Sequence, residues 1–334
     1  MKICIYGIGA VGGLIGARVA AEGSAEVTAI ARGATLAALS GGGLRLQSGE
    51  RLTQTRIRAT EHPAELGVQD VVVVSVKGPA LPAVAAGIAP LLGADTVVLS
   101  AMNGVPWWFF DGVAGPCAGM HLESVDPGGV VTAAIPARRV IGCVVHLNAS
   151  APEPGLVVHR TGNGLILGEP DGSASARVQQ LAQLLARAGF DVTTSARIQN
   201  DIWYKLWGNL TFNPISALTG ATGDRMLADP LVLAFCTAAM EEAARIGDRI
   251  GCAIKETPQQ RHTVTRKLGA FRTSMLQDAE AGRPLEIDAI VGAAKEIGER
   301  VGVATPTIDA LLGLIRLLGR TRGLYPEAAR GNWT

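Results

Sequence analysis

The chain has 334 residues, of which 48% are hydrophobic, and its 30 basic and 29 acidic side chains give a formal net charge of +1. This length favours two domains with buried cores. No uncharged apolar run approaches the roughly 20 residues of a membrane span, and glycines interrupt the apolar start of the chain, so we expect a cytoplasmic protein without a signal peptide or membrane partner. The absence of a basic run argues against nucleic acid and favours a small-molecule partner.

The cysteines are odd in number, far apart and never arranged as C-x-x-C. This pattern predicts neither a metal site nor a disulfide framework. We expect all five to be small buried apolar residues: Cys4, Cys117, Cys143, Cys236 and Cys252.

The first half alternates short β-branched runs with Ala-rich segments, which predicts an α/β domain with a Rossmann-type parallel sheet. A helix is expected over residues 11–21 and a polar helix over 173–188. The expected strands are 2–6, 26–31, 44–46, 56–59, 71–76, 96–100, 140–147, 165–168 and 191–194. Those between residues 140 and 168 are expected to extend the sheet as antiparallel edges.

The second half changes to long amphipathic helices and predicts an all-helical domain. The boundary is expected near Ser195, which gives a nucleotide-binding domain over residues 1–195 and a substrate and catalytic domain over 196–334. The expected helices are 200–216, 230–250, 257–281, 285–301 and 305–318.

A glycine motif follows the first strand and opens the first helix. Gly7 permits a tight turn, Gly9 allows backbone N–H groups to approach a pyrophosphate, and Gly12 allows the helix to pack closely on the strand. The six residues expected to bind a dinucleotide are Gly7, Ile8, Gly9, Ala10, Val11 and Gly12. In this glycine-rich chain the pattern alone is weak, and a plain turn is the alternative.

The end of the second strand indicates which dinucleotide is bound. An NAD site usually has a carboxylate there for the ribose 2′-hydroxyl, whereas this chain has Arg32. A guanidinium suits the 2′-phosphate of NADPH/NADP+. We therefore expect NADPH, with an exposed loop arginine as the alternative.

Two later strand ends carry polar residues. Lys77 follows the run 71–76, and Asn103 follows the run 96–100. Ligands of open α/β sheets bind at the carboxyl ends of strands, and an amide can both donate and accept hydrogen bonds. Each residue taken alone fits a turn, but together they indicate a site.

Lys205, one of only six lysines, lies among aromatic residues in the sequence WYKLW. Asn209 and Asn213 follow at four-residue spacing, so the three side chains form one polar stripe along a helix. Pro214 is expected to kink this helix. The alternative is an exposed helix face with a snorkelling lysine.

A second polar cluster lies downstream. Ser274 begins the sequence SMLQD, and Glu286 precedes Ile287 and Asp288 after a break at Gly282 and Pro284. The alternatives are that Ser274 is an ordinary helix residue and that the Glu286 carboxylate only stabilises the start of a helix by interacting with the helix dipole.

This combination of motifs resembles the ketopantoate reductase (2-dehydropantoate 2-reductase) family over nearly the whole chain. The resemblance implies that Arg32 and Lys77 contact NADPH and that Lys205 is the catalytic acid. It also implies that Glu286 contacts the substrate and organises Lys205. The residues implied to bind the 2-keto acid substrate are Asn103, Asn209, Asn213, Ser274 and Glu286. Pantothenate biosynthesis is implied by the resemblance alone.

A bulky apolar stretch, residues 107–110, follows Asn103 where many family members have smaller residues. It either packs in the core or lines a pocket for a branched or aromatic keto acid. A reductase or dehydrogenase for another 2-keto or 2-hydroxy acid therefore stays open. A non-catalytic NADPH sensor is a further alternative, and the long helices suggest a homodimer.

Overall fold

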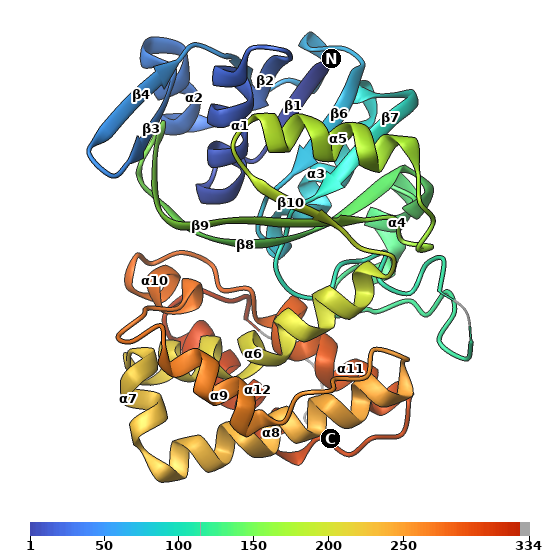
Figure 1. Cartoon of the computed structure of the whole chain (residues 1–334), viewed down its shortest axis with the longest axis vertical. Helices are drawn as coiled ribbons and strands as arrows, with labels where there is room; N and C mark the ends of the chain where they lie inside the picture. The colour runs from blue at the N-terminus through green and yellow to red at the C-terminus, as the bar shows by residue number, and fades with distance from the viewer. Residues whose placement is uncertain (114, 328–334) are drawn as a thin grey trace. The chain divides into compact units, whose positions relative to one another are not determined.

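The computed structural model describes residues 1–113 and 115–327, so the last seven residues of the predicted helical domain lie outside the described part. The chain divides into two compact units, Met1–Asp201 and Ile202–Thr334. Figure 1 shows the first unit with its strands and the second with its helices. The predicted α/β unit followed by an all-helical unit is confirmed.

The first unit is built on one ten-stranded sheet. Its strands are β1 (Lys2–Tyr6), β2 (Glu26–Ile30), β3 (Leu44–Ser48), β4 (Arg51–Thr55), β5 (Arg58–Thr60), β6 (Gln69–Val74), β7 (Leu92–Ser100), β8 (Val140–Glu153), β9 (Leu156–Gly168) and β10 (Asp191–Thr194). Its helices are α1 (Ala10–Glu22), α2 (Gly33–Gly42), α3 (Leu81–Gly87), α4 (Val130–Ala134) and α5 (Ala176–Arg187), and the start of α6 (Ile198–Thr219) also belongs to this unit.

The central strands β7, β6, β1, β2 and β5 are parallel, as predicted for a Rossmann-type sheet. Both faces of β1, β2, β6 and the second half of β7 are buried. Ile3 and Ile5 belong to the core shared with α1 and α5, whereas Cys4 between them points to the opposite face and is also fully buried. Burial on both faces explains why these strands read as continuous apolar runs.

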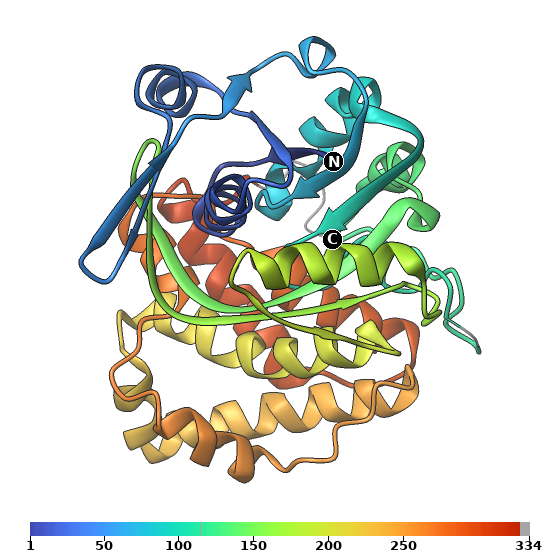
Figure 2. The ribbon, with the colours of Figure 1, turned by 45° about the horizontal axis from the view of Figure 1, so that its top comes forward.

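The prediction that β8 and β9 form edges is wrong. The order β4-β3-β9-β8-β7 places this antiparallel pair inside the sheet, because β3 pairs in parallel with β9 rather than with β2. The two strands are 14 and 13 residues long, and Figure 2 shows the hairpin they form running past α1. Helix α1 contacts both of them. The hairpin therefore covers the helix that the glycine motif opens.

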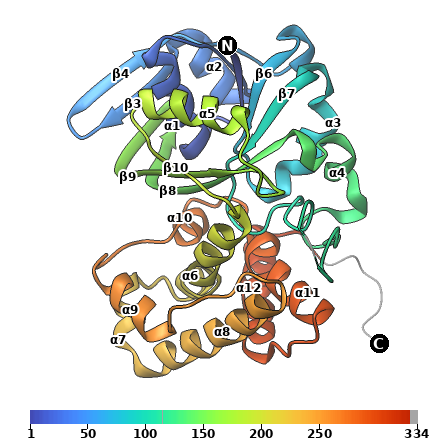
Figure 3. The same ribbon diagram turned by 45° about the vertical axis from the view of Figure 1, so that its right-hand side comes forward.

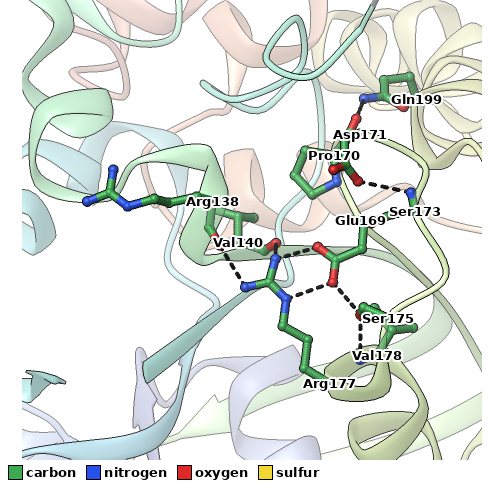
Figure 4. A network of polar contacts seen from close by, with 10 residues as sticks. All are labelled: Arg138, Val140, Glu169, Pro170, Asp171, Ser173, Ser175, Arg177, Val178 and Gln199. Atoms are coloured by element: carbon green, nitrogen blue, oxygen red, sulfur yellow. Dashed lines mark hydrogen bonds and ion pairs between the residues drawn. The ribbon is translucent and has the colours of Figure 1, made fainter. Parts of the chain in front are cut away.

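A buried ion pair fixes the turn between β9 and α5 (Figure 4). Glu169 is 3% exposed and pairs with Arg177 in the first turn of α5. The Arg177 guanidinium also donates to the carbonyl oxygens of Arg138 (2.7 Å) and Val140 (3.2 Å), which ties α5 to the start of β8. Because the loss of Arg177 would leave the buried Glu169 carboxylate without its partner, this network stabilises the first unit.

The second unit contains most of α6, then α7 (Gly223–Ala228), α8 (Pro230–Arg249), α9 (Pro258–Arg266), α10 (Ser274–Glu280), a π-helix (Asp288–Gly292), α11 (Ala293–Arg300) and α12 (Pro306–Thr321). Figure 3 shows these helices from another side. The single helix predicted over residues 257–281 is wrong. Phe271 packs against Gly223, where a Cβ would lie 1.9 Å from its ring, and the chain between α9 and α10 leaves the helical path to reach it.

Two tryptophans anchor α6 in this unit. Trp203 and Trp207 are almost fully buried, and their indole N–H groups donate to the carbonyl oxygens of Ala243 (3.2 Å) and Met240 (2.8 Å) on α8. Because both indoles point into the core, Lys205 between them lies on the opposite side of α6. Within the described residues, every helix is too short or too polar to cross a membrane.

All five cysteines are buried, as predicted. Burial raises the pKa of the Cys4 and Cys236 thiols to about 12, so both stay protonated and unreactive near neutral pH.

Candidate active site

The glycine motif forms the turn between β1 and α1. Gly7 has a φ of +109°, which glycine adopts without strain, and its carbonyl oxygen accepts a 2.9 Å hydrogen bond from the Ser75 hydroxyl. Gly9 precedes α1 without a side-chain cap, and a Cβ placed there would meet no atom within 4 Å. The space beside Gly9 is therefore open at the start of α1, where the unpaired N–H groups of a helix favour an anion such as a pyrophosphate.

Gly12 shows why this turn requires glycine. A Cβ at this position would lie 2.1 Å from Ser75 Oγ and 2.2 Å from the Gly7 carbonyl oxygen. We expect Gly12→Ala to destabilise the protein by about 1–3 kcal/mol through overpacking and to weaken NADPH binding. Thermal denaturation and a fluorescence titration with NADPH measure the two effects. Gly41→Ala in α2 is the matched control, since a Cβ there meets nothing within 4 Å; equal effects of both substitutions would contradict the explanation.

The end of β2 lies next to this turn, because β1 and β2 are paired in parallel up to Tyr6 and Ile30. Arg32 is exposed and directly precedes α2, whose first turn contains no acidic residue. A cavity of about 210 Å³ is lined by Ile8, by Thr35 in α2 and by residues 151–157 at the tip of the β8–β9 hairpin. The position that usually carries the carboxylate of an NAD site thus has a cation, directly before the helix whose Thr35 lines this cavity.

Lys77 and Asn103 follow neighbouring parallel strands, β6 and β7. Both side chains are half-buried. The N–H of Ala101 bonds to the Val74 carbonyl oxygen (2.9 Å) just beyond the paired segment, so the two strands end at the same edge of the sheet. The structure therefore brings Lys77 and Asn103 to the edge where the glycine motif also lies.

The aromatic stretch after Asn103 packs in the core of the first unit. Trp107, Trp108, Phe109 and Phe110 are each at most 4% exposed. The Trp107 indole donates to the Ile135 carbonyl oxygen (2.9 Å), and Trp108 lies against Gly142. These contacts support the core interpretation and leave no observation in favour of an enlarged pocket.

On α6 the polar stripe is present as predicted from the spacing. Lys205 and Asn209 are half-buried, and Asn213 is 5% exposed. The helix continues through Pro214 to Thr219, so the proline does not end it. The stripe is a row of polar groups on a helix whose residues are mostly buried.

Ser274 is fixed close to this stripe by two hydroxyl groups that the sequence did not single out. Thr273 caps α10, and its hydroxyl lies 2.5 Å from that of Ser216 on α6. The Ser216 hydroxyl also donates to the Asn213 carbonyl oxygen (2.9 Å). Thr273 is therefore linked through Ser216 to the turn of α6 that carries Asn213. Ser274, the first residue of α10, directly follows Thr273 and so lies close to this turn.

Glu286 is half-buried and directly precedes the last run of helices, which begins with a π-helix instead of the α-helix predicted over residues 285–301. The Asp288 carboxylate accepts hydrogen bonds from Arg316 (3.1 Å) and Tyr325 (2.7 Å), which hold this irregular turn in place. π-Helical turns occur frequently at functional sites. No sequence signal marked this one.

Two family models match this chain, one in each unit. Residues 3–107 match the family model described as "Ketopantoate reductase PanE/ApbA", and residues 197–319 match the model of its C-terminal part. A 2-dehydropantoate 2-reductase of Mesorhizobium japonicum is 45% identical over 325 residues, which cover 97% of this chain and 100% of the relative. The chain belongs to the ketopantoate reductase family.

Solved structures extend this assignment. A protein from Ralstonia solanacearum MolK2, classed as a ketopantoate reductase, has a TM-score of 0.94 at 58% identity and covers 97% of this chain and 99% of its own. A D-mandelate dehydrogenase solved with NADH and anilino(oxo)acetate has a TM-score of 0.84 at 21% identity, covering 97% of this chain and 100% of its own, which shows a shared fold. Membership of an oxidoreductase family makes this chain an enzyme that uses a nicotinamide cofactor.

Proposed function

We propose that this member of the ketopantoate reductase family reduces the ketone of 2-dehydropantoate to D-pantoate with NADPH. The polar stripe Lys205–Asn209–Asn213 carries the proposal, because it places one ionisable group in a row with two neutral amides on a mostly buried helix. Buried Trp107–Phe110 removes the argument for a bulkier keto acid. A sensor of NADPH needs only the nucleotide end and gives no reason for the stripe on α6.

The preference for NADPH over NADH is part of the same proposal. Arg32 supplies the planar cation that suits a 2′-phosphate, and no carboxylate stands at the end of β2 to bind a free ribose hydroxyl. Residues 7–12 would hold the pyrophosphate through backbone N–H groups. Lys77 and Asn103, at the ends of β6 and β7, would bind the remainder of the cofactor, with Asn103 also reaching the substrate.

In the proposed reaction the bound cofactor supplies the hydride to C2 of the keto acid. The ketone oxygen gains negative charge as the C2–H bond forms, and protonated Lys205 donates its proton to that oxygen. The product is a 2-hydroxy acid, and the neutral lysine amine recovers a proton from water. Asn209, Asn213 and Ser274 would orient the substrate by hydrogen bonds, and Glu286 would contact it while positioning the lysine.

Oxidation of NADPH, followed by its absorbance with purified protein and ketopantoate, tests this proposal. NADH and several other 2-keto acids are the parallel samples. Turnover with ketopantoate and NADPH well above all other pairs is the expected result. Preference for another keto acid would overturn the substrate, and NADPH binding without any turnover would favour a sensor.

The cytoplasmic location, the role in pantothenate biosynthesis and the homodimer stay predictions. The second unit exposes Leu231, Leu268 and Leu317 by more than 60% each, and such apolar side chains are candidates for a subunit contact. Sedimentation analysis of the purified protein measures the number of subunits.

A further inference from the structure

An arginine lies directly beside the proposed catalytic stripe. Arg261, in α9, has its guanidinium carbon 4.8 Å from the centre of the Tyr204 ring, and Nη1 donates to the Tyr204 hydroxyl (3.1 Å). A Cβ on Gly208 would lie 3.2 Å from Arg261 Nη2. The guanidinium therefore lies along α6, over the position where the helix has no side chain.

This position is adjacent to Lys205 on the helix surface. Lys205 follows Tyr204 and precedes Gly208 by three residues, and side chains three apart on a helix are neighbours, with about 5–6 Å between their Cβ atoms. Tyr204 and Gly208 form one row along α6, and Lys205, Asn209 and Asn213 form the next row. The Arg261 charge consequently flanks the polar stripe.

The protein compensates this charge incompletely. Among the described residues, the side chain of Arg261 has one hydrogen-bond acceptor, the Tyr204 hydroxyl, and no carboxylate within 4.0 Å. The Nε atom of Arg261 is buried and has no hydrogen-bond partner among the described residues. Glu256 is reached only through Tyr204, whose hydroxyl donates to it over 2.8 Å. A half-buried guanidinium with unused donors favours binding of an anion.

The proposed substrate has a negative charge close to the reacting ketone, and a cation beside the site would complement it. A 2-keto acid has a carboxylate bonded to the ketone carbon, so the group that binds it must lie next to the acid that protonates the ketone oxygen. Asn209, Asn213 and Ser274 are neutral, and Lys205 is assigned to the ketone oxygen. We propose that Arg261 binds the carboxylate of the 2-keto acid and so makes the enzyme selective for acids over neutral ketones, an inference that rests on the proposed function.

Gly208 has a role in the same arrangement. Any side chain at this position would push against the guanidinium, because an added Cβ at 3.2 Å is tighter than an ordinary van der Waals contact. Tyr204 holds the guanidinium at this place through its ring, 4.8 Å away, and through its hydroxyl, which accepts from Nη1. Tyr204 is thus a positioning residue for Arg261.

Paired substrates test the proposal in the full-length enzyme. Steady-state kinetics are measured with ketopantoate and with its methyl ester, which keeps the ketone and loses the negative charge. Arg261→Gln is expected to raise KM for ketopantoate about 10- to 100-fold and to leave KM for NADPH and the kinetics of the ester unchanged. Arg261→Lys should recover part of the lost affinity for ketopantoate, because it keeps the positive charge but cannot form the paired hydrogen bonds of a guanidinium. Arg266→Gln, an exposed arginine on the same helix, is the matched control.

The results with these variants decide between the proposal and its alternatives. An unchanged KM for ketopantoate in Arg261→Gln overturns the proposal, and so does an equal loss with acid and ester, which would indicate a structural role. If Arg261→Gln does not fold, Gly208→Ala provides the test: a few-fold rise in KM for the acid alone supports the proposal, and no selective rise overturns it. A wild-type enzyme that does not reduce ketopantoate would instead refute the proposed function itself.

Discussion

Replacing Lys205 with alanine is expected to lower kcat for ketopantoate by about 10²- to 10⁴-fold, the usual contribution of a positioned general acid. The reason is that the alkoxide oxygen would lose both its proton donor and the positive charge beside it. KM for NADPH should change little, since the proposed nucleotide residues lie in the first unit. Stopped-flow and steady-state measurements of NADPH oxidation give kcat, and a fluorescence titration gives the affinity for NADPH.

Lys267→Ala is the control for this experiment, because Lys267 is an exposed lysine at the end of α9. The variant should keep wild-type kinetics. Circular dichroism and thermal denaturation establish that Lys205→Ala folds normally. A folded Lys205→Ala variant with near-normal kcat would remove the lysine from the mechanism and leave proton donation to another group.

The spacing of residues in the sequence predicted those parts of the site that lie on a single helix or a single turn. The i, i+4, i+8 spacing of Lys205, Asn209 and Asn213 places them in one row on any α-helix, and the structure has that helix. The glycine turn was likewise predictable, because a strand, a tight turn and a helix follow one another within a few residues. Both inferences needed only the geometry of a single turn or helix.

Features that depend on contacts between distant segments were not predictable. The hairpin of β8 and β9 is longer than the apolar runs suggested, because Gly162 and Gly164 lie opposite His146 and allow the pairing to continue through irregular register. The break between α9 and α10 is caused by Phe271, whose partner Gly223 lies on α7. Arg261 was missed for the same reason, since its neighbours Tyr204 and Gly208 are more than 50 residues away in the sequence.

Replacing Arg32 with alanine is expected to raise KM for NADPH about 10- to 100-fold, because charge-assisted hydrogen bonds to the 2′-phosphate contribute about 1.5–3 kcal/mol. KM for NADH should stay unchanged, since NADH has no phosphate at that position. The ratio of kcat/KM for NADPH to kcat/KM for NADH, measured with saturating ketopantoate, should therefore fall by the same 10- to 100-fold. Arg51→Ala, an exposed arginine on β4, is the control and should keep the wild-type ratio.

Arg32→Asp sharpens the same experiment. A carboxylate at the end of β2 repels the 2′-phosphate and accepts hydrogen bonds from the ribose hydroxyls of NADH, so this variant should prefer NADH over NADPH. An Arg32→Ala variant that lost affinity for both cofactors equally would indicate that Arg32 stabilises the start of α2 instead of reading the phosphate. Because α2 begins directly after Arg32, thermal denaturation of both variants distinguishes these two roles: loss of NADPH selectivity at an unchanged melting temperature assigns the arginine to the cofactor.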